Sequence, residues 1–410
     1  MKCKECLNDF LIENAIFCPY CGSALFSCAL PIVSNETTQI HSWQAYQENT
    51  VYRDCSLSNG STPLCLCDSR SNDLRVTKRY QVAPDTVYFI TADIKTENVI
   101  NHENAINPLG ASISSGDYNC SRSILGTSEW QRIGVLGRSD EYGNLTVSFN
   151  LGYYFNTCSG KVWFDGVHIT PAENYVSGEN VWRFLAVIIT NTGIDTIDND
   201  TNQRILLSHT MSQEEICAIK KSFIELEADF NKDAGNLFKI KVDTLVLDTP
   251  CTDYTKMWAG YSISDTSALL YLKSNGIDVT CYDHIILTTA LPSLPATYFG
   301  LGGGNIYGRI GYSFVLHTNI ENSLAHFNGE WENMWPPAIY VHEFLHSVEF
   351  LSNALGLNVP RIDEEHQGYT FDFEGREWYR DFIHKRININ GSYHGVDPRM
   401  WRLRPSLFTL

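Results

Sequence analysis

The chain of 410 residues lacks the features that mark several common protein classes. Its first residues, MKCKECLNDF, have no apolar core of the kind that a secretory signal peptide requires. Its most apolar short runs, Phe184–Ile189 and His284–Leu287, are too short to cross a bilayer. We therefore expect neither membrane insertion nor standard secretion. This favours a cytoplasmic location and leaves non-standard export as the route to an extracellular one.

Positive charge is also scarce. The chain has 30 Lys and Arg against 47 Asp and Glu, giving a net charge of −17 and a pI near 5.1. A nucleic-acid or anionic-membrane partner requires a basic face, so this balance argues against both. The hydrophobic fraction of 43% and the charged fraction of 19% are those of a core-forming protein. At this length we expect a multidomain protein.

A phosphate-binding loop is missing as well. The segment 299–316, FGLGGGNIYGRIGYSFVL, has no Gly-Lys-Ser/Thr after its glycines, and Asn305 breaks the GxGxxG pattern. The segment predicts a glycine-rich turn followed by a strand over Gly308–Leu316.

The 13 cysteines divide into two groups. Nine are irregularly spaced, which does not suit a disulfide framework and favours reduced thiols. The other four form two CxxC pairs that match tetrahedral zinc, the alternatives being a redox motif or disulfides: Cys3, Cys6, Cys18 and Cys21.

Residues 1–26 therefore read as a small zinc-dependent domain. The segment is too short to fold by its own core, so the metal would supply the folding free energy. It resembles the short zinc ribbons at the N-terminus of many bacterial proteins, in which the zinc is structural. Residues 27–40, SCALPIVSNETTQI, read as a linker.

Residues 41–175 predict an all-β domain. Apolar and polar residues alternate in runs separated by Gly, Pro, Asn and Asp turn signals, a pattern typical of a β-sandwich. The predicted strands are Leu74–Val82, Thr86–Ile94, Trp130–Leu136, Leu145–Leu151 and Lys161–Ile169.

Parts of this domain resemble carbohydrate-binding jelly rolls. The resemblance lies in Tyr80–Phe89, Asp93–Asn98, Gly126–Trp130 and Val162–Val167. It implies a jelly-roll sandwich with a sugar site, which needs exposed aromatic side chains. Such aromatic residues are more often core or rim residues, and both interpretations apply to the candidates Trp43, Tyr46, Tyr118 and Tyr153.

Residues 180–410 mix helices and strands, which predicts an α+β domain. A helix over Ser212–Asn231 begins with a capping box, Ser212 followed by Glu215 three positions on. The other predicted elements are strands at Leu185–Thr190, Phe238–Leu247 and Asp283–Thr288 and a helix at Asp265–Ser274.

The most informative stretch of this domain is His342-Glu343-Phe344-Leu345-His346. On a helix two histidines four positions apart lie on one face and can reach one metal ion, with Glu343 beside its open position. Pro336 and Pro337 suit the start of that helix and Gly356 suits its end. The alternative is a pair of core histidines.

This region resembles the zincin type of zinc peptidase, and within it an uncharacterised bacterial group. The matching residues are His342–Glu349, Gly368-Tyr369 and Trp378–Phe382. Alignment with that group puts Asp363 at the position of its third zinc ligand, a histidine. Catalytic zinc usually has three protein ligands. The candidates for the third are Asp363 or His366, followed by Glu364 and Glu365, and the alternative is a solvated acidic loop.

The sequence therefore predicts a zinc metallopeptidase with one catalytic and one structural Zn²⁺. Glu343 would be the general base, and Tyr369 a donor to the oxyanion. The expected partner is a peptide or protein substrate, including glycosylated or cell-wall ones reached through the sandwich. The resemblance to zincins implies a substrate-binding edge strand, for which Gly308–Leu316 is the candidate, an ordinary core strand being the alternative. The alternative function is a glycan-binding or scaffold protein with an inactive zincin domain.

Overall fold

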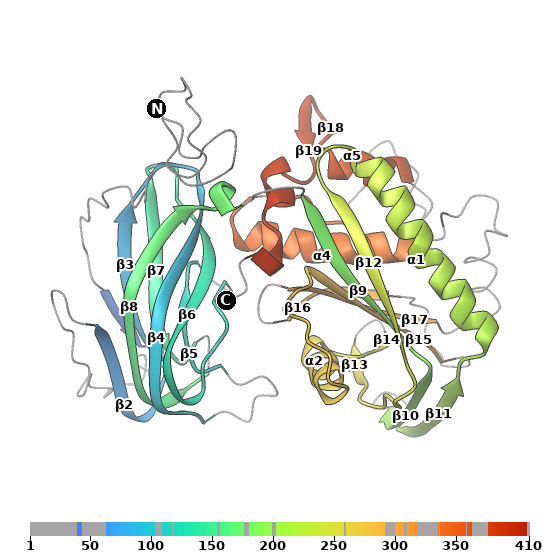
Figure 1. Ribbon diagram of the computed structural model, residues 1–410, viewed down its shortest axis with the longest axis horizontal. Coiled ribbons are helices and arrows are strands. Elements are labelled where there is room, and N and C mark those ends of the chain that lie inside the picture. Colours follow the sequence, from blue (N-terminus) through green and yellow to red (C-terminus); the bar gives the residue numbers. More distant parts are fainter. Residues whose placement is uncertain are drawn as a thin grey trace, which may run out of the picture. The chain divides into compact units, whose positions relative to one another are not determined.

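The chain folds into two compact units, and the division along the sequence falls between Glu179 and Asn180 (Figure 1). Each unit is described by itself. The computed structural model describes residues 39–42, 63–102, 109–116, 119–153, 156–175, 180–198, 202–257, 260–291, 300–306, 310–317, 335, 337–357, 359–362 and 376–407.

The first unit contains two four-stranded antiparallel sheets. One sheet has the strand order β1-β3-β7-β5 and the other has the order β2-β8-β4-β6. The first sheet is formed by β1 (Gln39–Ser42), β3 (Leu74–Gln81), β7 (Asn144–Leu151) and β5 (Ala111–Ser114). The second is formed by β2 (Leu64–Asn72), β8 (Cys158–Pro171), β4 (Val87–Asn101) and β6 (Gly126–Arg138), and the short 3-10 turn η2 (Ala172–Tyr175) follows β8.

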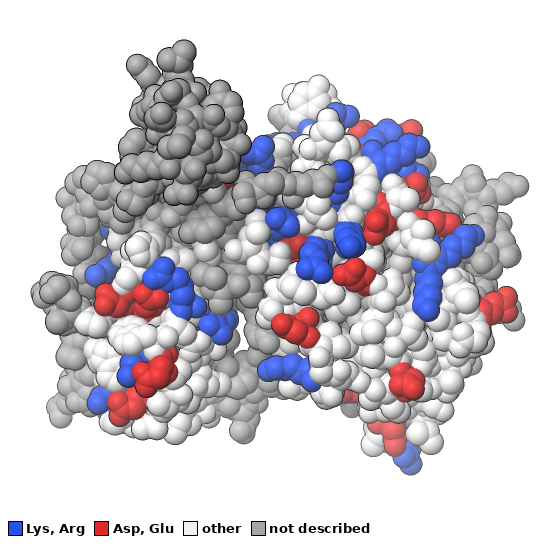
Figure 2. Space-filling model, in the orientation of Figure 1, with Lys and Arg blue, Asp and Glu red and all other residues white. Residues whose placement is uncertain are grey.

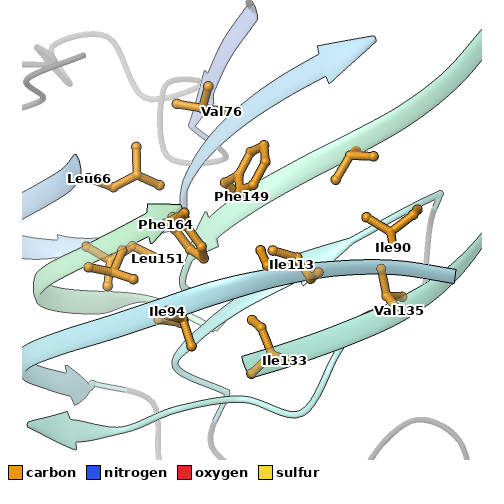
Figure 3. Packing of buried hydrophobic residues seen from close by; sticks show 14 of the residues in the cluster. Leu66, Val76, Ile90, Ile94, Ile113, Ile133, Val135, Phe149, Leu151 and Phe164 are labelled. Atoms are coloured by element: carbon orange, nitrogen blue, oxygen red, sulfur yellow. The ribbon is translucent and has the colours of Figure 1, made fainter. Parts of the chain in front are cut away.

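One hydrophobic core joins strands of the two sheets (Figure 3). Along β4 every second residue enters it, as the two-residue period of a strand requires, and Ile90, Ala92 and Ile94 are fully buried. Phe149 of β7 meets Phe164 of β8 edge to face, with ring centroids 5.2 Å apart. The predicted β-sandwich is confirmed. Its first strand begins at Gln39, so the last two residues of the predicted linker belong to the sandwich.

The second unit is built on a five-stranded sheet with the order β12-β9-β15-β17-β16. The first four strands are parallel, and β16 runs antiparallel to β17. The strands are β9 (Val181–Ile189), β12 (Lys239–Leu247), β15 (His284–Ala290), β16 (Gly300–Ile306) and β17 (Ile310–His317).

The sheet corrects two expectations about the glycine-rich segment. Residues Gly300–Ile306, predicted as a turn, form the edge strand β16, because pairing with β17 outweighs the low strand propensity of glycine. The strand predicted at Gly308–Leu316 is present from Ile310 on as β17, but it is not an edge strand. It is paired on both sides and completely buried between β15 and β16, as the alternative of an ordinary core strand requires.

Helices cover both faces of this sheet. The crossover from β9 to β12 carries α1 (Gln213–Ala234), and the crossover from β12 to β15 carries α2 (Asp265–Ser274). Parallel crossovers are right-handed, and the step from β9 to β12 runs across the sheet in the direction opposite to the step from β12 to β15, so the two helices lie on opposite faces. Alongside α1 lies α4 (Ala338–Ala354), where Phe223 meets Tyr340 with ring centroids 4.8 Å apart. The capping box of α1, Ser212 with Glu215, is confirmed.

Because both faces are covered, the central strands are buried in nearly every residue. On the α2 face Leu185, Val187 and Ile189 join a core with Ala268 and Leu272. On the other face an aromatic cluster binds α4 to the sheet, and its members are Trp182, Phe184, Phe344 and Trp401.

Gly311 lets α4 approach the sheet closely. A Cβ at this position of β17 would lie 2.4 Å from Nδ1 of His284 and 3.0 Å from Cβ of Ser347 on α4. The Ser347 hydroxyl donates to the Tyr312 carbonyl at 3.3 Å. The helix with the two histidines is therefore seated directly on β17 and passes beside the edge strand β16.

Smaller elements complete the second unit. The helix α5 (Arg376–Ile383) follows α4 in the chain. Three antiparallel hairpins are formed by β10 (Asn191–Asp198) with β11 (Gln203–Thr210), β13 (Thr255–Met257) with β14 (Gly260–Ser262), and β18 (Ile387–Ile389) with β19 (Ser392–His394). The 3-10 turns η3 (Pro398–Arg402) and η4 (Pro405–Leu407) end the described chain. Of the helices described, none has the length and apolar character needed to cross a membrane.

Candidate metal centre

The predicted histidine helix is present as α4. Pro337 is its N-cap residue and Leu355 its C-cap residue, followed by Gly356 with a left-handed φ of 64°. A left-handed residue just after the C-cap is a common helix end, and glycine adopts it without steric cost. Twelve of the 17 residues are buried, including His342 and Glu343, each 5% exposed.

The two imidazole rings converge through the same atom of each ring. The Nε2 atoms of His342 and His346 lie 3.1 Å apart. Two nitrogens bound to one tetrahedral zinc at the usual bond length would lie about 3.3 Å apart. The structure therefore brings the two predicted ligands together with the spacing that one metal ion requires. Glu343 follows His342 on the same buried stretch of α4.

The other ring nitrogen of each histidine faces a protein group. Nδ1 of His342 lies 3.1 Å from the hydroxyl of Tyr379, and Nδ1 of His346 lies 3.5 Å from Oε2 of Glu349. A histidine that binds metal through Nε2 carries its proton on Nδ1 and gives it to such a partner. Both partners belong to the matched motif; Glu349 is a helical neighbour of His346, whereas the contact of Tyr379 with His342 depends on the folded chain.

A clamp between α1 and α5 holds Tyr379 in place. Arg376, the first residue of α5, pairs with Asp233 at 2.6 Å and with Asp229 at 3.1 Å, both on α1. His384 just beyond α5 contacts the Asp233 carbonyl at 2.8 Å. Tyr379 itself is 3% exposed. The phenol that faces His342 is thus fixed by contacts at both ends of its short helix.

The remaining predicted ligands lie outside the described residues. This applies to Asp363, His366, Glu364, Glu365, to the proposed oxyanion donor Tyr369, and to Cys3, Cys6, Cys18 and Cys21. Within the described ranges no group of three or more His, Cys, Asp or Glu side chains is placed to hold a metal ion. The described part of the centre is accordingly a pair of histidines. Their convergent Nε2 atoms fit a zinc ion that takes its third protein ligand from elsewhere in the chain.

The sandwich offers a second candidate site, on the outward face of the sheet β2-β8-β4-β6. Trp163 of β8 is half-buried and stands between Val162 and Phe164, which enter the core, so its ring is on the outer face beside its ladder partner Lys95. On the same face Arg132 donates to both carboxylate oxygens of Asp93, at 2.8 and 2.7 Å. These bonds hold the pKa of Asp93 below its usual range.

The exposed aromatic residues of this unit differ from those expected. Tyr153 is only 2% exposed, and it packs beneath Arg75 and donates to the Gly116 carbonyl, so of its two interpretations the core residue is correct and the exposed sugar platform is not. Trp43, Tyr46 and Tyr118 lie outside the described residues. Trp130 of β6, which is 45% exposed, was not singled out. Alternation with the core residues Ile133 and Val135 could have marked the outward positions of its strand.

Charge on the described surface is mixed. In Figure 2 Lys and Arg side chains stand among Asp and Glu side chains on the visible face of each unit. Within the sandwich this mixing includes the pair of Lys95 with Glu129 at 3.0 Å. Such a face suits neutral polar ligands better than a polyanion.

Comparisons with known proteins add little. No protein-family model matches the chain, and no curated protein matches it. The chain is similar to the solved structure of TmCBM61 in complex with β-1,4-galactotriose, with 12% identity, a TM-score of 0.23, and coverage of 33% of this chain and 88% of that one. It is also similar to a family 11 carbohydrate-binding module from Clostridium thermocellum, with 12% identity, a TM-score of 0.20, and coverage of 36% and 92%.

A third similar structure is the tailspike protein 4 of bacteriophage CBA120, with 14% identity, a TM-score of 0.19, and coverage of 33% of this chain and 18% of that one. TM-scores at this level carry no argument about ligand or activity. The β-sandwich rests on its own two sheets and shared core.

Proposed function

We propose that the second unit is a zinc-dependent peptidase whose catalytic metal is held by His342 and His346. The observation that supports this most is the 3.1 Å separation of the two Nε2 atoms, with a protein group facing each Nδ1. A hydrogen bond between the two imidazoles would have the same length; the metal is favoured because Glu343 stands beside the pair in the spacing of a zinc-hydrolase helix. The third ligand comes from Asp363 or His366.

In this proposal a bound zinc ion supplies Lewis acidity that lowers the pKa of a water molecule and polarises the scissile carbonyl. Glu343 accepts the proton of that water and passes it to the leaving amine. The buried position of Glu343, 5% exposed, keeps bulk water from competing for the proton. Tyr369 is proposed as a donor to the developing oxyanion.

The position of the edge strand β16 favours a peptide as the substrate. It is the last strand of the sheet, it is antiparallel to β17, and α4 passes beside it. An extended peptide can add to such an edge through main-chain hydrogen bonds, which places its amide bonds along the strand. This role replaces the one expected for Gly308–Leu316, because Ile310–His317 form the interior strand β17.

The exchange Glu343→Gln tests the proposal. The amide has the shape of the carboxylate but accepts no proton. We expect hydrolysis of an unstructured protein such as casein to fall about 10²–10⁴-fold while the zinc content of the chain stays that of the parent. The exchange Glu214→Gln, at an exposed glutamate in the first turn of α1, is the control for loss of a negative charge. Turnover retained by Glu343→Gln would rule out Glu343 as the base.

We propose a second function, glycan binding, for the outward face of the sandwich. It is supported by the outward ring of Trp163, the exposed ring of Trp130, and the fixed polar pair Asp93 and Arg132 on the neighbouring row of the same sheet. Sugars stack on aromatic rings and bond to planar polar groups, and this face offers both.

A glycan array with the parent and with Trp163→Ala and Trp130→Ala tests this second function. We expect the parent protein to bind at least one glycan on the array, and we expect the Trp163→Ala and Trp130→Ala variants to lose that binding. The exchange of Tyr142, which is 73% exposed in the turn before β7, to Ala is the control for loss of an exposed aromatic ring. If the parent and all three variants bound the same glycans equally well, the glycan site would lie outside Trp163 and Trp130. If the parent bound no glycan, the proposed glycan-binding function of the sandwich would be wrong.

A further inference from the structure

Glu349 stands out among the carboxylates near the histidine pair. It lies on α4 one turn beyond His346, and its side chain is 14% exposed. One of its oxygens, Oε2, serves two partners. It lies 3.5 Å from Nδ1 of His346, and it accepts the backbone N–H of Ile362 at 3.1 Å.

The geometry excludes two ordinary roles for this residue. Glu349 cannot share the metal with His342 and His346, because it faces Nδ1 of His346 while Nε2 faces His342. It is also unlike a solvated surface glutamate such as Glu225, which pairs with Lys221 at 3.8 Å and is 33% exposed.

The second partner of Glu349, the backbone N–H of Ile362, connects it to a segment beyond α4. Ile362 is fully buried, and the chain arrives there after leaving α4 at Ala354. The next residue is Asp363, the first candidate for the third ligand. One carboxylate oxygen therefore contacts the second histidine and also fixes the backbone immediately before that candidate.

We propose that Glu349 is a positioning residue that fixes both the His346 ring and the backbone at Ile362, the residue directly before the first candidate for the third metal ligand. This proposal rests on the proposed function of the site. The carboxylate holds the His346 ring in one orientation with the proton on Nδ1, which leaves Nε2 as the metal-binding atom. Its bond to Ile362 sets the point from which the chain continues. Loss of the Glu349 carboxylate therefore removes its contacts with the His346 ring and with the backbone at Ile362 at once.

His342 provides an internal comparison, because its Nδ1 faces the neutral phenol of Tyr379 and not a carboxylate. A carboxylate opposite an imidazole N–H adds a Coulombic attraction that a neutral phenol lacks. Glu349 in addition accepts the backbone N–H of Ile362, directly before Asp363. Removal of the carboxylate should therefore weaken metal binding more than the exchange Tyr379→Phe does.

The test is the zinc dissociation constant of the full chain, measured by competition with a chromogenic chelator. The relevant zinc is the one that His342→Ala fails to bind. We expect its dissociation constant to rise about 10-fold in Glu349→Gln, which keeps an acceptor for the Ile362 N–H, and up to about 100-fold in Glu349→Ala. Tyr379→Phe should raise the zinc dissociation constant less than Glu349→Gln does.

Glu227→Gln is the matched control. Glu227 on α1 accepts the backbone N–H of Val242 at 2.8 Å, so it is also a helix carboxylate that tethers a neighbouring segment, but its contact is with β12. Its zinc dissociation constant should equal that of the parent.

Two results separate failure of this proposal from failure of the proposed function. If Glu349→Gln and the control bind zinc equally tightly, and as tightly as the parent, Glu349 is not a positioning residue. If His342→Ala binds as much zinc as the parent, the histidine pair holds no metal and the proposed function itself is wrong. Thermal unfolding of Glu349→Gln beside Glu227→Gln shows whether both variants are folded. Glutamine retains the shape of the glutamate side chain, which alanine removes.

Discussion

The two units use β-sheets in opposite ways. The sandwich buries one face of each sheet in a shared core, and the other face of the sheet β2-β8-β4-β6 displays Trp163, Asp93 and Arg132. In the second unit helices cover both faces of one sheet, and β15 and β17 are buried along their whole length. A sheet that is covered on both faces has no face left for a ligand.

This difference shows where function can reside in each unit. In the sandwich a broad face is available, which suits an extended polar ligand. In the second unit the proposed chemistry would be confined to the edge strand β16 and to α4 beside it, where His342 and His346 converge. The two units should therefore respond independently to substitutions, and each of the following experiments tests that separation.

The largest effect is expected at the third ligand. We predict that Asp363→Ala loses the zinc held by His342 and His346 on dialysis and loses all peptidase activity, because two imidazoles alone do not hold zinc at neutral pH against a chelator. Glycan retention by the sandwich should not change. Metal analysis of Asp363→Ala beside His366→Ala decides between the two candidates. Zinc loss in His366→Ala alone would identify the histidine.

The next effect concerns the sandwich core. Phe149 is 2% exposed and packs on Phe164. We expect Phe149→Ala to lower the unfolding free energy of the sandwich by about 3–5 kcal/mol. Calorimetry of the full chain should show the transition of the sandwich shifted and that of the second unit unchanged. Thr146→Ala, at an exposed position of the same strand, is the control. A shift of both transitions by Phe149→Ala would contradict independent folding.

The smallest effect concerns the buried His284 of the second unit, whose Nε2 lies 2.8 Å from the Ser313 hydroxyl. Burial lowers the pKa of His284 to about 3, whereas the unfolded chain has the ordinary value of 6.5. Below pH 6.5 the unfolded state therefore binds a proton that the folded state does not. The stability of this unit should fall on the order of 1 kcal/mol per pH unit as the pH drops from about 6 toward 4.

Denaturant titrations at pH 7, 6 and 5 on the parent and on His284→Gln measure this effect. The glutamine retains a polar group for Ser313 but does not titrate, so the difference between the two proteins isolates His284. Equal pH slopes for both would show that His284 does not titrate on unfolding. The transition of the sandwich serves as the internal reference, because His284 belongs to the other unit.

Local signals predicted much of the fold. The capping box of Ser212 and Glu215 marks the start of α1, and Asn275-Gly276 marks the end of α2, whose bounds agree with those expected. The sandwich strands follow from alternation. The sequence failed where pairing partners decide the structure, because β16 is a strand of glycines held by β17, and the hairpin of β10 with β11 is half exposed and weakly patterned.

The candidate site divides in the same way. His342, Glu343 and His346 follow from the period of a helix, and the position of Glu349 three residues beyond His346 is also a helical neighbour. Tyr379 could not be assigned, because its contact with His342 depends on the clamp between α5 and α1 that Arg376 forms with Asp229 and Asp233. Contacts between distant segments are visible only in the folded chain.

The most direct test of the account is the zinc content of the purified full chain beside His346→Ala, after equal dialysis against a weak chelator. The account predicts that the variant holds one zinc fewer per chain than the parent, with any zinc at the four N-terminal cysteines unaffected. Equal zinc content in the two proteins would contradict the claim that His342 and His346 form a metal centre.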